Sequence, residues 1–268
     1  MLSQQSLNNC VLKAKLDNVK NLSLLLKCVQ FKEFAVCYAT QRGLKFLVED
    51  SKCVQAAAFV GKNIFQEYVI GEELLFFKIE LNVLIECLAI LDGEAALNLY
   101  YEGHGFPLRL VLVEDDILTD CSIKTMETVE NVHFSMPVED VVNKMIVDGP
   151  RFKEVLSDLD PDSEYVEMLV SPDPPYFVVT TLSISGKCQV VLPKDADMIE
   201  EFSPAVTSVT RYKYSQIKPT MKTLQIASKV SVQLNGQGLL CLQFMVKNEQ
   251  NQLAYIEFFC TPVLPEED

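Results

Sequence analysis

Residues 10–48 carry the pattern that decides the fold. They contain CVLKAK at residues 10–15, VKNLSLLLKCV at 19–29, FAVCYAT at 34–40 and LKFLV at 44–48. Alternating or β-branched and aromatic runs predict strands, and the longer apolar stretch at 19–29 predicts a helix. Arg42 and Gly43 mark a turn between the last two runs. The pattern therefore reads strand, helix, strand, turn, strand.

The same order of elements returns about 130 residues later. Residues 141–147 (VVNKMIV) predict a strand, 151–159 (RFKEVLSDL) a helix, and 165–170 (YVEMLV) and 176–181 (YFVVTT) two more strands. Pro172 and Pro174 mark the turn before the last of these. Few positions are identical, so the repeat is one of pattern. A repeated unit of this size indicates two similar domains.

Strand patterns dominate the rest of the chain. They occupy residues 66–70, 74–79, 97–101, 107–113 and 117–124, and then 187–192, 206–214, 224–233, 239–246 and 254–260. Residues 80–91 (ELNVLIECLAIL) have the three–four apolar spacing of a helix that packs on a sheet. In the second half the short polar segment 215–222 takes that place, and Pro219 limits it to a turn or two. Sheet-rich halves with helices on one face predict an α+β fold.

The domain boundaries follow from this repeat. We expect an N-terminal domain at residues 1–124, a C-terminal domain at 136–262 and an acidic tail at 263–268. Residues 125–135 (TMETVENVHFS) have no clear periodicity and are predicted to connect the domains.

Composition narrows the class of protein. The chain has 268 residues, of which 49% are hydrophobic, and a polar start without a basic cluster or apolar core. No stretch reaches the roughly 18 apolar residues of a membrane helix. We therefore expect a folded cytosolic or nuclear protein that does not contact a membrane. The nine cysteines form no CxxC pair and sit mostly in apolar runs, which is typical of buried free thiols.

The charge is unevenly distributed. A net charge of −14 argues against a general nucleic-acid binder, because phosphate contacts need lysine and arginine. However, residues 202–248 contain no acid and six cations: Arg211, Lys213, Lys218, Lys222, Lys229 and Lys247. Such segregation is compatible with an acidic exterior and one basic working surface, or with lysines that simply solvate a face.

An enzyme is disfavoured by the residues available. Candidate metal-holding carboxylates, Asp115 with Asp116 and Asp158 with Asp160 and Asp162, fall at turns, where acids are usually solvated caps. Only His104 and His133 could serve a nucleophile or a zinc ion, and neither has suitable neighbours in the sequence. No P-loop or GxGxxG is present. We predict a protein without catalytic residues, metal or cofactor.

The chain resembles the PCNA-like sliding-clamp family. The repeated element order carries the resemblance, together with the ending LAYIEFFCTP at 253–262 and the acidic tail. Within that family it is similar to subunits of the heterotrimeric DNA-damage checkpoint clamp. The runs that carry this closer likeness are LDNVKNLSLLLK at 16–27, CVQAAAF at 53–59, IFQEY at 64–68, SPDPPYF at 171–177, LPKD at 192–195 and RYKYSQIKP at 211–219.

The resemblance implies a ring of three clamp chains around duplex DNA, loaded at damaged DNA in the nucleus. Helices would line the inner face, antiparallel sheets would form the outside, and the partners would be two paralogous clamp subunits and a clamp loader. DNA contacts would be made without sequence specificity by Lys20, Lys27, Arg151, Lys153, Lys213, Lys218 and Lys222. The helix at 80–91 departs from this pattern, since it offers Glu80 and Glu86 and no cation.

The resemblance also implies two kinds of protein contact. Subunit edges would be the strands 117–124 and 187–192, represented by Ile117, Leu118, Cys121, Ile123, Cys188, Val190 and Leu192. A groove for short peptides of repair and checkpoint proteins would be formed by Phe59, Met245, Tyr255, Phe259 and Pro262, roofed by Val129, Val132 and Phe134. Met245 and Phe259 could equally be core residues of their strands. The alternative function is a β-rich signalling scaffold that does not encircle DNA.

Overall fold

The computed structural model describes residues 10–91, 94–129, 133–247 and 253–263. The chain divides into two compact units: residues 1–49 with 57–132, and residues 50–56 with 133–268. The short segment 50–56 is held in the second unit, where Thr261 N donates a hydrogen bond to Cys53 O at 2.9 Å. The outer residues of the predicted tail, 264–268, lie outside the described residues.

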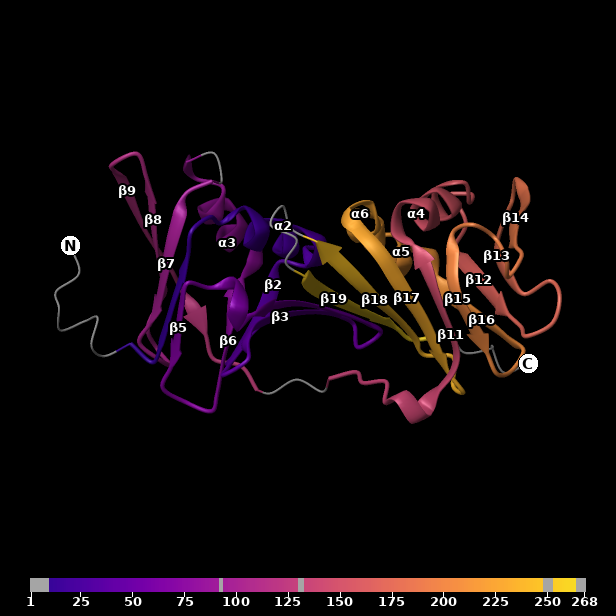
Figure 1. Cartoon of the computed structure of the whole chain (residues 1–268), viewed down its shortest axis with the longest axis horizontal. Helices are drawn as coiled ribbons and strands as arrows, with labels where there is room; N and C mark the ends of the chain where they lie inside the picture. The colour runs from indigo at the N-terminus through magenta and orange to yellow at the C-terminus, as the bar shows by residue number, and fades with distance from the viewer. Residues whose placement is uncertain (1–9, 92–93, 130–132, 248–252, 264–268) are drawn as a thin grey trace. The chain divides into compact units, whose positions relative to one another are not determined.

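In the residues that the structure describes, the first unit has strands in two sheets and the α-helices α2 and α3 (Figure 1). In chain order its elements are β1 (Leu12–Leu16), α2 (Lys20–Val29), β2 (Phe34–Thr40), β3 (Gly43–Asp50), β4 (Val54–Gly61), η1 (Lys62–Ile64), β5 (Glu67–Ile70), β6 (Leu74–Glu80), α3 (Leu81–Leu88), β7 (Ala96–Tyr101), β8 (Leu108–Glu114), β9 (Ile117–Ile123) and β10 (Thr125–Met126). One sheet has the strand order β5-β1-β7-β8-β9, and the other has β10-β6-β2-β3-β4.

The second unit repeats this arrangement (Figure 1). Its elements are η3 (Val138–Asp140), β11 (Val141–Asp148), α4 (Gly149–Ser157), β12 (Tyr165–Val170), β13 (Phe177–Ser183), β14 (Gly186–Leu192), β15 (Ile199–Pro204), β16 (Ser208–Lys213), α5 (Tyr214–Ile217), α6 (Thr220–Ile226), β17 (Ala227–Asn235), β18 (Leu240–Lys247) and β19 (Leu253–Cys260). Strand order is β15-β11-β17-β18-β19 in one sheet and β16-β12-β13-β14 in the other.

The repeat predicted from the sequence is present as a repeat of strand order. The series β5-β1-β7-β8-β9 corresponds element by element to β15-β11-β17-β18-β19. Likewise β6-β2-β3-β4 corresponds to β16-β12-β13-β14. In the first unit β10 is added beyond β6. The α+β fold of two similar domains predicted from the sequence is confirmed at this level.

Each unit has its own apolar core between sheets and helices. In the first, α2 packs against α3 and buries Leu22, Leu25, Leu26 and Val29. In the second, α4 packs against α6, β11 and β17, and its Phe152 ring lies 6.2 Å from that of Phe177. The start of α4 approaches the α6–β17 junction closely, since a Cβ on Gly149 would lie 2.2 Å from Ala227 O. Helix α4 can therefore dock there only with glycine at this position.

Four sequence expectations about elements need correction. The helical segment expected at residues 215–222 is longer, because α5 and α6 continue it on either side of Pro219 as far as Ile226. Proline is well suited to the start of a helix, and here it begins a second one. The strand expected from residue 224 therefore begins only at Ala227. Strands β4 and β15 were not predicted, and Thr125–Met126, expected in the connector, forms β10 on β6.

Candidate functional site

The cations expected to face DNA lie on or beside four of the helices. Lys20 and Lys27 are on α2, Arg151 and Lys153 on α4, and Lys218 and Lys222 at α5 and α6, with Lys213 immediately before α5. Lys153 is half-buried and the other six are exposed. Helix α2 contains no acid, and α5 and α6 contain none either. These helices thus present positive charge on an acidic chain.

Most of these helical cations lack a carboxylate partner. Lys20 Nζ lies 3.5 Å from Glu94 Oε1, with both side chains about half exposed. Within the described part of the chain no carboxylate is paired with Lys27, Arg151, Lys153, Lys213, Lys218 or Lys222. Lys153 Nζ instead donates to Gln225 Oε1 at 3.2 Å, and Lys218 Nζ to Pro161 O at 2.9 Å. Their charge is therefore not neutralised locally, and it is available to an external anion.

Cations on the strands are arranged differently. Arg211 Nε donates to Glu167 Oε2 at 2.9 Å, and Lys144 Nζ lies 3.1 Å from Glu201 Oε1. Lys229 also pairs with Glu200. An acid-free stretch of sequence is therefore not an acid-free surface, because other strands of the same sheets bring Glu167 to Arg211 and Glu200 to Lys229. The tertiary structure thus neutralises these three strand cations, whereas Lys213 and the cations of α2, α4, α5 and α6 other than Lys20 have no carboxylate partner among the described residues.

Helix α3 carries a different charge from the other helices. It extends from Leu81 to Leu88 with Glu80 as its N-cap residue, and it contains Glu86 but no cation. Its buried residues are Leu81, Leu84, Ile85 and Leu88, the face that the sequence predicted. Helix α3 thus contributes packing and one negative charge.

The two strands expected at subunit edges are both the last strands of their sheets. Strand β9 ends the series β5-β1-β7-β8-β9, and β14 ends the series β16-β12-β13-β14. Ile117 and Leu118 at the start of β9 are 56% and 63% exposed, whereas Ile123 and Leu192 are buried. Cys121, Cys188 and Val190 are intermediate. An unpaired edge with exposed apolar side chains is a favourable place for strand addition.

Two cysteine thiols, one on α3 and one on β9, lie next to each other. Cys87 on α3 interacts with Cys121 on β9, and burial together with this neighbour raises the pKa of the Cys87 thiol to about 11. At neutral pH Cys87 is therefore a protonated, unreactive thiol. Among the described residues no group of histidine, cysteine and carboxylate side chains could hold a metal ion. No described helix is both long and apolar enough to cross a membrane.

The residues expected in a peptide groove fall into separate groups. Phe59 belongs to the first unit, where it packs on a cluster formed by Val36, Tyr38, Leu47 and Ala57. In the second unit Met245 and Tyr255 are cross-strand partners on β18 and β19, and Tyr255 is 48% exposed. Phe259 is buried and its ring lies 6.2 Å from that of Phe134.

Polar residues separate these two groups within the second unit. Glu257 lies between Tyr255 and Phe259 on one face of β19, and it accepts a hydrogen bond from Gln243 at 3.1 Å. Gln243 in turn accepts one from Gln233 at 3.0 Å. Pro262 is half-buried, Val129 is 80% exposed, and Val132 lies outside the described residues. On this face the second unit therefore offers exposed Tyr255 beside half-buried Met245.

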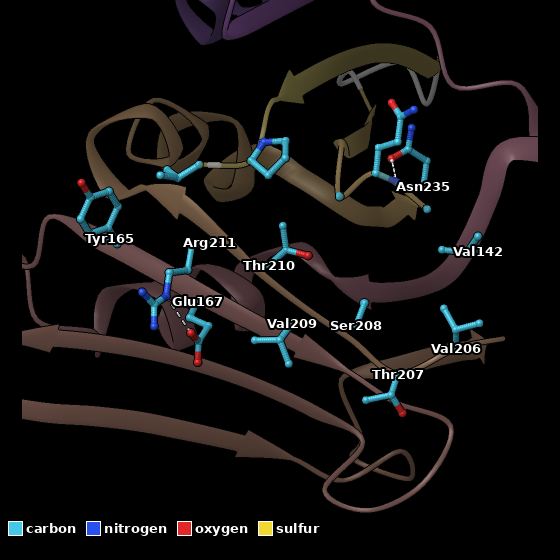
Figure 2. A pocket seen from close by; sticks show the side chains of 15 residues that line it. Val142, Tyr165, Glu167, Val206, Thr207, Ser208, Val209, Thr210, Arg211 and Asn235 are labelled. Atoms are coloured by element: carbon cyan, nitrogen blue, oxygen red, sulfur yellow. Dashed lines mark hydrogen bonds and ion pairs between the residues drawn. The ribbon is translucent and has the colours of Figure 1, made fainter. Parts of the chain in front are cut away.

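A hollow that the sequence did not predict lies elsewhere in the second unit. It has a volume of about 860 Å³ and follows β16 (Figure 2). Val206, Val209 and Arg211 line one side of it, with Asn235 and Pro262 opposite. The sequence signal was the exposed pair Val206 and Val209 in an otherwise polar run, which looked like an ordinary strand. We call this hollow the β16 groove.

Comparison with solved structures shows which fold the chain has. The PCNA2–PCNA3 complex from Sulfolobus tokodaii aligns with a TM-score of 0.75 at 15% identity, covering 93% of this chain and 98% of that one. The chain therefore has the PCNA-like clamp fold.

Sequence comparison then identifies the family within this fold class. The family described as Repair protein Rad1/Rec1/Rad17 matches residues 11–246. The Cell cycle checkpoint protein RAD1 of Homo sapiens is 42% identical over 257 residues, which cover 94% of this chain and 91% of that protein. The DNA repair protein Rad1 of Drosophila melanogaster is 30% identical, covering 96% and 95%. The chain belongs to the Rad1 family, and the resemblance to the checkpoint-clamp subunit is confirmed.

Proposed function

We propose that this chain is a non-catalytic subunit of a ring-shaped DNA clamp, loaded at damaged DNA in the nucleus, where it serves checkpoint signalling and repair factors. The observation that carries the proposal is the set of helical cations without carboxylate partners, on a chain of the Rad1 family. Contacts of this kind attract phosphates irrespective of base sequence, so the clamp would slide.

Ring closure is proposed to use the edges of β9 and β14. Each is the last strand of its sheet, and each would pair with a different neighbouring subunit. Two partners that resemble this chain in fold would complete a heterotrimer. Ile117 and Leu118 would be buried at one junction, and Cys188 and Val190 would lie at the other.

Assembly is tested first, because every later step depends on it. Native mass spectrometry of the chain co-expressed with two candidate clamp subunits should give a 1:1:1 complex. A homotrimer would instead indicate a ring of identical subunits. A monomer that ignores both candidates would contradict the ring and favour the alternative, a signalling scaffold that does not encircle DNA.

The DNA-facing surface is tested by charge reversal at exposed helical cations. Lys27→Glu, Arg151→Glu and Lys222→Glu together should weaken retention of the assembled ring on closed circular DNA. The slope of log affinity against log salt should fall by up to about three, one for each lost phosphate contact. The scaffold alternative predicts no change, so unaltered retention at low salt would contradict the threaded ring.

A matched control separates the location of charge from its amount. Arg42→Glu, Lys52→Glu and Lys62→Glu change the net charge equally, but at exposed positions outside the α-helices. We expect the control to assemble and to be retained nearly as well as the unaltered ring. Equal losses in both triple variants would mean that net charge, rather than the helical surface, governs retention.

Peptide recognition by the second unit is proposed to involve Met245 and Tyr255. Exposed Tyr255 and half-buried Met245 form a cross-strand pair, and aromatic and methionine side chains suit short apolar anchors. Tyr255→Ala should weaken binding of partner peptides without affecting assembly. Phe259→Ala, which removes a buried ring, should instead lower the melting temperature.

A further inference from the structure

Among the described strands, β16 has a partner strand on one side only. It is the last strand in the order β14-β13-β12-β16. Beyond its end, Tyr214 N donates to Glu164 O at 2.8 Å on the β12 side. On the opposite side, Arg211 O accepts from Val263 N at 2.8 Å. Because main-chain groups alternate sides along a strand, Val209 N–H and C=O face the same way as those of Arg211, into the β16 groove.

The β16 groove gives this edge a defined length. At its far end Ala205 N donates to Val142 O at 2.9 Å, and at its near end stands the Val263–Arg211 bond. The extended part of this edge runs from Ser208 to Arg211 and spans about 10 Å, which leaves room for roughly three or four added residues. Val209 on this part is 57% exposed, and Val206 in the bend before it is 46% exposed. Figure 2 shows both side chains with Asn235 and Val142, which also line the groove.

The corresponding strand of the first unit shows how an edge of this kind can be covered. Strand β6 of the first unit corresponds to β16, and it is covered by β10, in which Met126 pairs with Lys78. Lys78 is three residues before α3 and Arg211 is three residues before α5. Met126 and Val263 each follow the preceding strand end, Ile123 or Cys260, by three residues. Both units therefore add their own chain to the same edge at the same place.

Among the described residues, the chain's own ladder along this edge ends at Val263. Two positions later the sequence has Pro265, which has no N–H to donate to Val209 O. A second chain without proline at that position is better suited to extend the ladder.

We propose that the β16 groove binds an extended peptide from another protein, added as a strand to β16 next to Val263. The apolar side chains of the peptide would pack on Val206 and Val209. A carboxylate would meet Arg211 and Lys187, which share a smaller hollow with the single acid Glu167. Main-chain hydrogen bonds would supply affinity, while the valines and cations would select an alternating apolar sequence with an acidic end. The site lies wholly within the second unit, and its Lys187 is on β14, the strand proposed for a ring junction, so binding is tested on the unassembled chain.

The probe is a fluorescein-labelled pentapeptide that begins with aspartate, which an antiparallel strand places nearest Arg211, and continues with alternating valine and threonine. Fluorescence anisotropy should show saturable binding to the full chain. Peptides methylated on the amide nitrogens that face β16 should bind about tenfold more weakly, the loss expected for one or two hydrogen bonds. Methylation of the intervening amides should have little effect. This pair of peptides leaves the protein unaltered and therefore needs no variant.

Substitutions at one position provide the second arm. Val209→Pro removes the N–H that faces the groove but no hydrogen bond to β12, and edge strands tolerate such a proline. Val209→Thr, the matched control, keeps both the N–H and the side-chain shape. We expect Val209→Pro to lose about tenfold in affinity and Val209→Thr to lose little. Circular dichroism checks that both variants are folded.

Any of the following outcomes would overturn the proposal. The first is no saturable binding up to about 1 mM peptide. The second is an equal loss of affinity when either set of peptide amides is methylated. The third is an equal loss of affinity in Val209→Pro and Val209→Thr. Binding that appears only after removal of residues 264–268 would assign the groove to the chain's own end. A concentration-dependent dimer that the probe dissociates would assign it to a second copy.

Discussion

The two units have the same strand order, but the residues at equivalent positions of their helices differ in charge, capping and backbone conformation. Helix α2 begins with Lys20 after Val19, whereas α4 begins with Gly149 after the capping side chain of Asp148. Helix α3 is a single helix with Glu86, while its counterpart is broken at Pro219 and carries Lys222. Strand order depends on apolar periodicity, which both halves keep. Surface and cap residues are free of that constraint, so they differ.

The largest expected difference concerns the fourth residue after each N-cap. This position is Phe152 in α4, which is fully buried, and Ser23 in α2, which is 5% exposed. Phe152→Ala should lower the free energy of unfolding by about 3–5 kcal/mol, because a large cavity forms. Ser23→Ala should cost less than about 1 kcal/mol. Differential scanning calorimetry measures both, and equal effects would mean that the two helices are packed alike.

A smaller effect is expected at the first residue of α4. Gly149→Ala places a methyl group against the carbonyl of Ala227, so α4 must shift. We expect a loss of about 1–3 kcal/mol in the free energy of unfolding. Gly71→Ala in the first unit is the control, since its nearest neighbour would be Val11 O at an ordinary 3.7 Å. If Gly149→Ala left thermal unfolding unchanged, α4 could move away from the α6–β17 junction without loss of stability.

The charge difference between α3 and α6 can be exchanged. Lys222→Glu should weaken DNA retention of the assembled ring, and the salt slope should fall by about one. Glu86→Lys gives α3 the cation that it lacks and should strengthen retention by a similar factor if α3 faces DNA. Filter binding across a salt series measures both slopes. No response to Glu86→Lys, with a clear response to Lys222→Glu, would confine DNA contact to the other helices.

The smallest expected effect is a pH dependence at equivalent edge positions. Asp120 on β9 pairs with Arg109, whose hydrogen bond holds the pKa of Asp120 below its ordinary value. Its counterpart on β19, Glu257, instead accepts from the neutral Gln243. A depressed carboxyl pKa stabilises the fold above the unfolded-state pKa, and this contribution is lost as pH falls through the folded-state value.

Asp120→Asn therefore tests that linkage directly. Because both partners are about a third exposed, the loss at pH 7 should be only about 0.2–1 kcal/mol. The difference from the unaltered protein should disappear at a pH well below the ordinary carboxyl value. Melting curves at several pH values would show this convergence. A difference that persisted in acid would mean that Asp120 acts through shape rather than charge.

Much of the fold could be read from residue patterns. Residues 34–40 and 165–170 were placed with the bounds that the structure has, because long alternating or apolar runs admit one reading. The alanine-rich Val54–Gly61 and the polar Ile199–Pro204 were missed, since their strand character comes from neighbouring strands. Pro219 was taken to end a helix, and it begins another. The helical cations were identified from family likeness, but their lack of partners required coordinates.

The sequence by itself determined the repeat, the α+β class and the family, because these depend on periodicity along the chain and on shared residues. Tertiary structure decided which charges are neutralised and which edges are covered. Arg211 meets Glu167 across 44 residues, and Val263 meets Arg211 across 52. Such pairs depend on strand register, which local sequence does not encode. The β16 groove exists for the same reason: it is the part of an edge that the chain's own strands leave uncovered.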